Sequence, residues 1–235
     1  ASLSLAGRVI EKVTGSPYER AMSELVLEPL GLTSTWFFPN DIMTRRFAVG
    51  HTRHEDGTVT VARPWALPRS ATPAGGLSAN ARDQLAWARF HLGDGTAADG
   101  TRVLSEESLK AMQQPTADMR GSALGDAVGM SWLLAEIGGV KTVAHGGTTN
   151  GQYSDFLLVP ERGFGVISMS NCGPNGSQLN HKVVRWALEH HLGLVDVEPQ
   201  PLRLRDEELA PYTGRFETIA AVIDMTTEDG RISAK

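Results

Sequence analysis

The sequence predicts an α+β fold in which an antiparallel sheet is flanked by helices. Three observations predict it. Apolar residues at helical spacing, with helix stop signals, dominate the first 113 residues. From Val128 the apolar period changes to two, and short turns containing glycine or proline separate the strands, which implies antiparallel neighbours. A helix follows these strands, so the two element types are segregated along the chain.

The predicted helices carry recognisable ends. Gly15 and Gly193 are typical helix stop signals, and Ser16 followed by Pro17 is typical of a helix start. Ser78 or Asn80 can cap the third helix, and Ser105 followed by two glutamates opens the fourth. We predict helices over residues 4–14, 17–30, 81–92, 105–113 and 178–192.

The predicted strands are short and closely connected. We predict them over residues 128–137, 141–144, 154–160 and 165–171. Glu161-Arg162-Gly163 has the composition of a tight hairpin connection. Residues 39–73 read as a loop with a small hairpin around Asp56-Gly57.

Composition narrows the function classes. Of 235 residues, 41% are apolar and 21% are charged, which suits a globular protein with a full core. Lys plus Arg number 22 against 27 Asp plus Glu, so the chain lacks the basic excess of a nucleic-acid binder. The single cysteine, Cys172, excludes an internal disulfide framework and a cysteine-based zinc site, and it leaves the compartment open. No apolar run is long enough for a membrane span.

The chain divides into three predicted regions. Residues 1–193 form the main domain, residues 194–211 form a linker with three prolines, and residues 212–235 begin a small β domain. The first helix leaves little room for an N-cap. The last hairpin, with a strand over 220–225 and a turn at 228–230, breaks off during its return strand. We therefore expect the sequence to be a piece of a longer protein.

The most informative segment for chemistry is residues 144–151, between two predicted strands. Gly146 and Gly147 follow His145 and allow a ligand to approach the backbone closely. In such a turn the N–H of Thr148 can stabilise an oxyanion, and His145 can donate a hydrogen bond or transfer a proton. The alternative, which the pattern alone favours, is a glycine-rich hairpin with an exposed histidine.

Other chemistry-bearing residues give weaker signals. His51 and His54 lie in a polar loop, and His190-His191 lies at a helix C-terminus, so we expect structural roles for all four. No serine is followed three residues later by lysine, and neither a G-x-S-x-G elbow nor a phosphate-binding loop is present. No cofactor and no metal site is therefore predicted.

Five segments occur in an order and spacing that point to one family. They are Leu5–Tyr18, Glu28–Thr35, Pro73–Leu85, His145–Gly147 and Leu158–Gly163. From about residue 1 to residue 192 the chain resembles the serine β-lactamase/penicillin-binding-protein-like superfamily. Within it, class C β-lactamases and their esterase and D-aminopeptidase relatives are the most similar. The resemblance implies a β-lactamase/transpeptidase-like fold that lacks its N-terminal part.

The resemblance also implies a reaction. Members use a Ser-x-x-Lys nucleophile motif, a Tyr-x-Asn motif that supplies a base, and a third motif on a strand. Only the third is present here, as His145-Gly146-Gly147, because no tyrosine has asparagine two positions later. The parent protein would be a serine hydrolase that hydrolyses an ester, a β-lactam or a D-amino-acid peptide through an acyl-enzyme. This chain alone would be inactive.

By the resemblance, the third motif and its neighbours form one wall of the acyl pocket. Thr148 N–H would be one oxyanion donor, and His145 would contact the substrate carboxylate or the base. The remaining pocket residues would be Gly146, Gly147, Thr149, Asn150 and Gln152. Histidine in place of lysine favours an esterase or peptidase, and the loop over residues 36–72 would influence substrate choice.

Two alternatives stay open from the sequence. The scaffold can be a degenerate, non-catalytic binding or regulatory module, or a second chain can supply the missing N-terminal half. In every case the expected partner is a small-molecule ester, lactam or peptide, with no nucleic acid.

Overall fold

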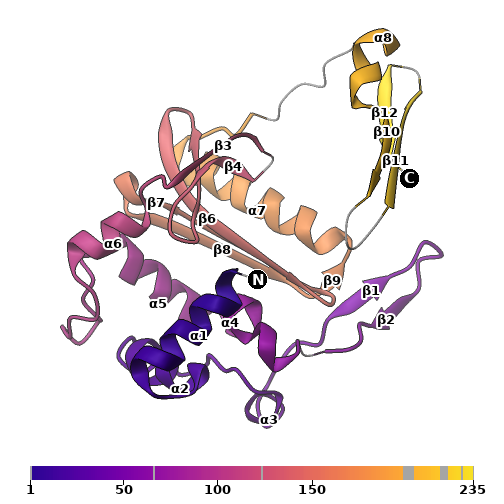
Figure 1. Ribbon diagram of the computed structural model, residues 1–235. Helices are drawn as coiled ribbons and strands as arrows, with labels where there is room; N and C mark the ends of the chain where they lie inside the picture. Colours follow the sequence, from indigo (N-terminus) through magenta and orange to yellow (C-terminus); the bar gives the residue numbers. More distant parts are fainter. Residues whose placement is uncertain are drawn as a thin grey trace. The chain divides into compact units, whose positions relative to one another are not determined.

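The computed structural model describes residues 2–65, 67–122, 124–197, 204–217, 222–228 and 230–234 (Figure 1). The chain forms two compact units, Ala1–Asp196 and Val197–Lys235. The predicted boundaries at residues 193 and 211 remain a prediction. No helix within the described ranges has the length and apolar content that crossing a membrane requires.

A six-stranded antiparallel sheet organises the first unit. Its order, β3-β4-β5-β6-β7-β8, follows the sequence, since each strand turns back beside the one before it. The strands are β3 Ala117–Ser122, β4 Gly125–Val128, β5 Leu133–Ile137, β6 Val140–Thr149, β7 Gln152–Val159 and β8 Phe164–Ser170. A 3-10 turn, η3 (Pro160–Arg162), and Gly163 in the left-handed conformation connect the last two, where the tight connection was predicted. The predicted α+β class is confirmed.

Two strand predictions are wrong in their bounds. Residues 128–137 form parts of two strands, because the chain turns at residues 129–132, where Ser131 has φ 61°. Strand β6 does not end at Ala144 as predicted but continues through the glycine pair to Thr149. Pairing with β7 along this whole length outweighs the local preference of glycine for turns. The turn itself falls at Asn150 and Gly151.

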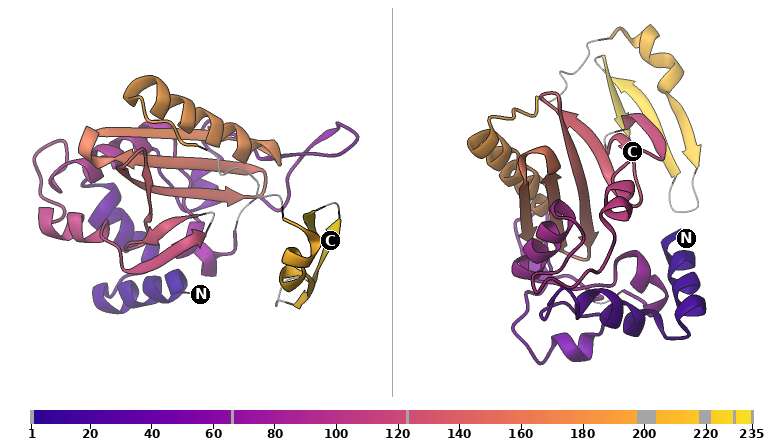
Figure 2. Two further views of the ribbon diagram at one scale, coloured as in Figure 1. Left: turned by 90° about the horizontal axis from the view of Figure 1, so that it is seen from above. Right: turned by 90° about the vertical axis from the view of Figure 1, so that its left-hand side faces the viewer.

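Helices cover both faces of the sheet, as Figure 2 shows from above. Helix α5 (Ala81–Leu92) packs through Ala88 on one face, against the side chains of Val143 and Leu158. Helix α7 (Asn175–Leu192) packs on the other face through Val184 and Leu188. Because successive strand residues point to opposite faces, β6 and β7 contribute apolar residues to both layers.

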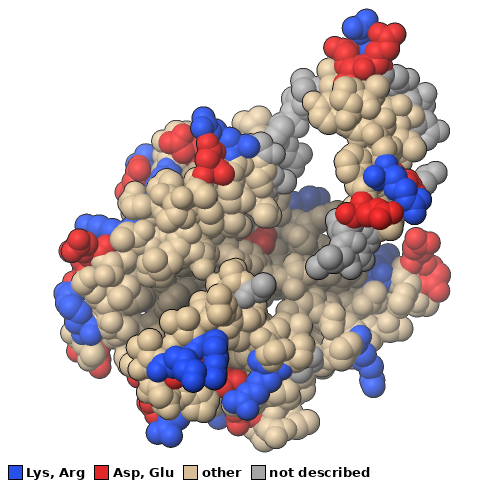
Figure 3. All heavy atoms as spheres, viewed as in Figure 1, with Lys and Arg blue, Asp and Glu red and all other residues tan. Residues whose placement is uncertain are grey.

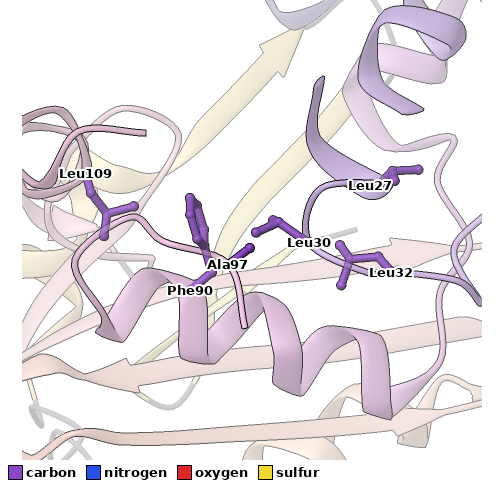
Figure 4. Packing of buried hydrophobic residues seen from close by; sticks show 6 residues of the cluster. All are labelled: Leu27, Leu30, Leu32, Phe90, Ala97 and Leu109. Carbon is purple, nitrogen blue, oxygen red and sulfur yellow. The ribbon is translucent and has the colours of Figure 1, made fainter. Parts of the chain in front are cut away.

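A second core lies on the far side of α5, away from the sheet. Figure 4 shows Phe90 of α5 directed toward leucines that come from two segments of the chain. Helix α6 (Glu106–Met112) contributes one of them. Ser105 caps the start of this helix, as predicted, because its Oγ accepts a hydrogen bond from Ser108 N–H. The cluster consists of Leu27, Leu30, Leu32, Phe90, Ala97 and Leu109.

The N-terminal helices differ in one respect from the prediction. Helix α1 spans Ser2–Thr14 and stops before Gly15, as expected. The predicted helix over residues 17–30 is instead α2 (Tyr18–Met22) continued by a π-helical turn, η1 (Ser23–Leu27). Ser16 does not cap it. The Glu11 carboxylate of α1 accepts the Tyr18 N–H instead, so a contact between helices supplies the cap.

Short elements lie within the predicted loop. The loop predicted over residues 39–73 contains helix α3 (Pro39–Ile42) at its start, and the 3-10 turn η2 (Arg69–Ala71) and the beginning of helix α4 (Thr72–Gly75) at its end, so the prediction is wrong at both ends. Strands β1 (His51–Arg53) and β2 (Val59–Val61) form the predicted hairpin around Asp56-Gly57. Strand β1 also pairs in parallel with β9 (Cys172–Gly173), which joins this loop to the end of the sheet.

The second unit is small. It contains helix α8 (Asp206–Leu209), the 3-10 turn η4 (Ala210–Tyr212) and a three-stranded antiparallel sheet. Its strands are β10 (Gly214–Glu217), β11 (Val222–Glu228) and β12 (Arg231–Ala234). The predicted strand over 220–225 is present from Val222 on, and its first two residues and Asp229 of the predicted turn lie outside the described residues.

Charge is evenly mixed on the face of the first unit that Figure 3 shows. Acidic and basic side chains lie there in small groups separated by uncharged residues. This face therefore carries no single-sign field of the kind that attracts a polyanion.

Candidate active site

One cleft of about 810 Å³ in the first unit lies between the end of the sheet and residues 34–81. Its sheet wall follows from strand alternation. Gly147 pairs with Ser154, and Thr149 pairs with Gln152, so all four belong to the same face of β6 and β7. Met169 and Asn171 continue this wall from the end of β8.

The opposite wall is aromatic and basic. Trp36, Phe47 and Trp65 line it together with Arg45 and Arg46. The Phe47 and Trp65 rings lie 5.6 Å apart between centroids, and the Arg45 guanidinium lies 4.0 Å from the centroid of the Trp36 ring. This wall offers apolar surface and positive charge to a bound molecule.

Hydrogen bonds to Asp83 of α5 and to the backbone of Ser78 hold Trp36 and the two residues before it in place. The Asp83 carboxylate accepts the Ser34 N–H and the Thr35 hydroxyl, each at 2.7 Å. Trp36 and Ser78 exchange two backbone hydrogen bonds of 2.8 Å. Ser78 also lines the cleft, so this bridge positions both residues.

Helix α4 forms the floor of the cleft through Thr72 and Gly75 and is backed by α1. A Cβ added to Gly7 of α1 would lie only 2.3 Å from Pro73 Cγ. The two helices therefore approach as closely as they do because Gly7 has no side chain.

Strand β6 leaves one of its edges unpaired beside the cleft. Strand β5 pairs with β6 only over Val140–Ala144, whereas β7 pairs with it as far as Thr149. Among the described residues, no strand lies against the other edge of His145–Thr149. Backbone N–H and C=O groups on a free edge can bind an extended ligand.

The predicted site residues fall into three positions. Gly147, Thr149 and Gln152 line the cleft. Gly146 and Thr148 occupy the alternate positions of β6, so their side-chain directions point to the α7 face. His145 is exposed, its Nδ1 lies 2.7 Å from the carbonyl oxygen of Gly146, and it does not line the cleft.

The side-chain amides at the end of the sheet hold the loop. Gln152 Nε2 donates to the Ala48 carbonyl oxygen at 3.0 Å, and Asn171 Nδ2 donates to that of Val49 at 3.0 Å. Asn150 Nδ2 donates to the Pro64 carbonyl oxygen. Both Asn150 and Gln152 are predicted from the sequence to bind substrate. In the structure both anchor the loop, and of the two only Gln152 lines the cleft.

Behind the glycine pair lies a partly buried carboxylate. Asp155 pairs with Gly146, and a Cβ on that glycine would lie 3.2 Å from Asp155 Oδ1. Burial raises the pKa of Asp155, and the nearby His181 of α7 offsets this in part. Asp155 is a residue that the sequence reasoning missed, because only strand pairing places it beside β6.

Hydroxyl groups line the cleft, but no lysine does among the residues that the structure describes there. Ser78, Ser154 and Ser170 are lining residues, as is Tyr153. Lys141, on β6, donates to the Gln113 carbonyl oxygen at 2.6 Å and is not a lining residue. The cleft as described therefore holds no serine–lysine pair.

The other histidines make ordinary structural contacts. His51 Nδ1 lies 3.2 Å from the Asn171 carbonyl oxygen, and His54 Nε2 lies 2.8 Å from Thr60 Oγ1. Within the described part of the chain, no three His, Cys, Asp or Glu side chains gather in a way that would hold a metal ion.

Comparison with known proteins matches this chain to one family. The family model described as Beta-lactamase matches residues 1–190. Penicillin-binding protein 4 of Amycolatopsis lactamdurans is 32% identical over 219 residues, which cover 91% of this chain and 57% of that protein.

Solved structures share the fold. The octameric penicillin-binding protein homologue from Pyrococcus abyssi has a TM-score of 0.70 at 21% identity and covers 97% of this chain and 50% of its own. A class C β-lactamase from Rhodobacter sphaeroides has a TM-score of 0.61 at 23% identity, and the match covers 77% of this chain and 57% of that one. A D-amino acid amidase from Ochrobactrum anthropi has a TM-score of 0.60 at 24% identity, and the match covers 76% of this chain and 53% of that one. The chain thus spans about half the length of the relatives it matches.

Proposed function

The chain belongs to the beta-lactamase family, and from this we propose that the whole protein is a serine hydrolase that works through an acyl-enzyme. One observation carries the proposal. The free edge of β6 at His145–Thr149 borders the cleft, and Gly147 on that strand adds no side chain to obstruct a ligand. An acyl group lying along this edge has its carbonyl close to backbone donors.

The proposed reaction divides the work between this chain and polypeptide outside it. A serine from a Ser-x-x-Lys motif attacks the substrate carbonyl carbon while a base takes the hydroxyl proton. The bond to the leaving group then breaks, and the proton passes to that group. Water attacks the acyl-enzyme in turn, releasing the acid and restoring the serine. Thr148 N–H supplies one hydrogen bond to the oxyanion in both steps.

His145 is proposed to contact the substrate carboxylate or the tyrosine base. Its exposed position at the start of the free edge supports a role that depends on the rest of the protein. Imidazole is a weaker and pH-dependent cation compared with the lysine that dedicated β-lactamases carry. We therefore propose an ester or a D-amino-acid peptide as substrate, in preference to a β-lactam.

A substrate panel tests this function. The full-length protein is assayed with a p-nitrophenyl ester, D-alanine p-nitroanilide and nitrocefin. We expect kcat/KM for the ester or the anilide to exceed that for nitrocefin at least tenfold. Gly147→Val, which places a branched side chain in the cleft, is expected to abolish turnover. Thr226→Val, which introduces the same side chain at an exposed strand position outside the cleft lining, is the matched control.

Two results would contradict the proposal. Faster turnover of nitrocefin would overturn the substrate preference. No turnover of any substrate, together with substituted Ser-x-x-Lys and Tyr-x-Asn positions in the upstream gene sequence, would favour a non-catalytic binding module.

A further inference from the structure

We propose that the cleft selects substrates in which an aromatic ring lies next to a carboxylate, and that the residues around Arg45 recognise both groups. The inference deepens the proposed function, because it names the substrate class of the same cleft. Three features of the cleft carry it: its charge, its aromatic surface and the anchoring of the loop that provides them.

The charge of the cleft is opposite to that of the chain. The chain carries a formal charge of −5. Among the described residues that line the cleft, Arg45 and Arg46 are basic and none is acidic. Neither arginine has an ion pair with an acidic side chain in the described part of the protein. Two unneutralised guanidinium groups in a concave site attract an anionic ligand.

Arg45 is also positioned for recognition. Its guanidinium lies against the Trp36 ring at 4.0 Å. Stacking on an indole restrains the guanidinium plane and leaves its N–H edge free to donate two parallel hydrogen bonds. A carboxylate matches that edge geometrically, whereas an amide in its place offers only one acceptor oxygen.

The aromatic surface lies two residues farther along the same loop. Phe47 is 45% exposed although its ring contacts Trp65, so the two rings leave an uncovered apolar surface inside the cleft. A flat aromatic group packs well on such a surface and displaces water from it. Because residues 45 and 47 are so close in sequence, the charge and the apolar surface are presented together.

The loop is anchored to the sheet immediately beyond these residues. Ala48 and Val49 accept side-chain hydrogen bonds from Gln152 and Asn171, and His51 N–H donates to the Asn171 carbonyl oxygen at 2.8 Å. Gly50 packs against the Asn150–Gly151 turn so closely that a Cβ there would lie 2.2 Å from the Asn150 carbonyl oxygen. A recognition surface held in this way loses little entropy on binding.

A binding experiment on the 235-residue chain tests the inference without requiring catalysis. Three probes are titrated by calorimetry: hippurate, which has a ring and a carboxylate; hippuramide, its neutral amide; and N-acetylglycine, which lacks the ring. We expect hippurate to bind at least tenfold more tightly than either of the other two. Its advantage over hippuramide should shrink as NaCl rises.

Variants separate the two parts of the surface. Arg45→Gln with Arg46→Gln is expected to remove the preference for hippurate over hippuramide. Phe47→Leu is expected to remove the preference for hippurate over N-acetylglycine. Arg53→Gln and Trp186→Leu alter exposed residues outside the cleft lining and are expected to change neither ratio.

Equal affinity for all three probes, no measurable binding, or preferences that survive the cleft variants would overturn the inference. These outcomes are distinct from failure of the proposed function. If the full-length protein hydrolyses none of the substrates but the chain still prefers hippurate, the proposed recognition surface is supported and the proposed hydrolase activity is contradicted.

Discussion

Gln152 Nε2 donates a 3.0 Å hydrogen bond to the carbonyl oxygen of Ala48, and this contact joins the beginning of β7 to the loop that carries Arg45 and Phe47. The two residues are 104 positions apart in the sequence. Together with the amides of Asn150 and Asn171, the contact makes the aromatic and basic wall of the cleft part of the sheet's framework.

Replacing Gln152 by alanine should loosen this wall. We expect the free energy of unfolding to fall by about 1 kcal/mol, the usual net value of one hydrogen bond, and amide exchange at residues 45–49 to accelerate. Hydrogen exchange with mass spectrometry measures the second effect. Gln178→Ala, at an exposed position of α7, is the control and should leave exchange in this loop unchanged. If amide exchange at residues 45–49 is equally fast in both variants, the Gln152 amide does not anchor the loop.

Gly147→Ala should destabilise the protein through a single neighbour. The added Cβ would lie 2.8 Å from Ser154 Oγ, which is closer than such atoms approach in proteins. We expect a loss of about 1–3 kcal/mol, as for other overpacked sites. Ser154→Ala in the same chain removes the clashing atom and should restore most of the loss in chemical denaturation. If the double variant is no more stable than the single one, the clash lies elsewhere.

Arg69→Gln should leave a buried carboxylate without its ion-pair partner. Glu19 on α2 has a side chain only 7% exposed, and Arg69 donates to both of its oxygens, at 2.9 and 3.0 Å. Leaving that carboxylate unpaired should cost about 1–3 kcal/mol. Arg20→Gln breaks the exposed pair with Glu24 and should destabilise the protein far less, because water screens that pair.

The same pair gives a pH signature. Hydrogen bonds from Arg69 lower the pKa of Glu19 below its usual 4.5. Its stabilisation is therefore fully present above that value and is lost as pH falls through the lowered pKa of the folded state. Below pH 4.5 the free energy of unfolding should fall less in Arg69→Gln than in the unchanged protein. An identical fall in both proteins would contradict the pairing.

His91 should govern stability at a higher pH. The residue is 3% exposed. Its ring centroid lies 4.3 Å from that of Trp87, 5.4 Å from that of Phe90 and 4.9 Å from that of Trp132. Neither ring nitrogen has a hydrogen-bond partner among the described residues. Burial lowers the pKa of His91 from 6.5 to about 4. The unfolded chain therefore takes up a proton first as the solution is acidified, and stability falls between pH 6.5 and 4.

The size of this effect follows from the shift of the pKa. It amounts to about 3 kcal/mol at the acid end of the window. His91→Leu should flatten the profile between pH 6.5 and 4.5, whereas His54→Leu, at an exposed residue, should leave it unchanged. An unaltered slope in His91→Leu would assign the acid sensitivity to another group.

Local sequence signals predicted the starts of α5 and α6. Asn80 accepts the Asp83 N–H at 2.9 Å and Ser105 caps α6, because capping depends on residues three positions apart. The hairpin at Asp56-Gly57 is likewise local, with φ +85° at Gly57.

Long-range contacts explain what the sequence did not predict. The glycine pair reads locally as a turn, but pairing of β6 with β7 extends the strand to Thr149. The cleft wall at Arg45 and Phe47 depends on amides about 100 positions away. No local pattern encodes such a contact. The resemblance to a family implies that Gly146, Gly147, Thr149, Asn150 and Gln152 bind substrate. Gly147, Thr149 and Gln152 line the cleft, and the role of all five stays a prediction.

Labelling with a fluorophosphonate, read by intact mass and peptide mapping, shows which part of the protein carries the nucleophilic serine. We expect no adduct on the 235-residue chain and one adduct per molecule of the full-length protein, on a serine outside these residues. A stoichiometric adduct on a serine of this chain, such as Ser78 or Ser154, would contradict this expectation, as would a full-length protein that remains unmodified.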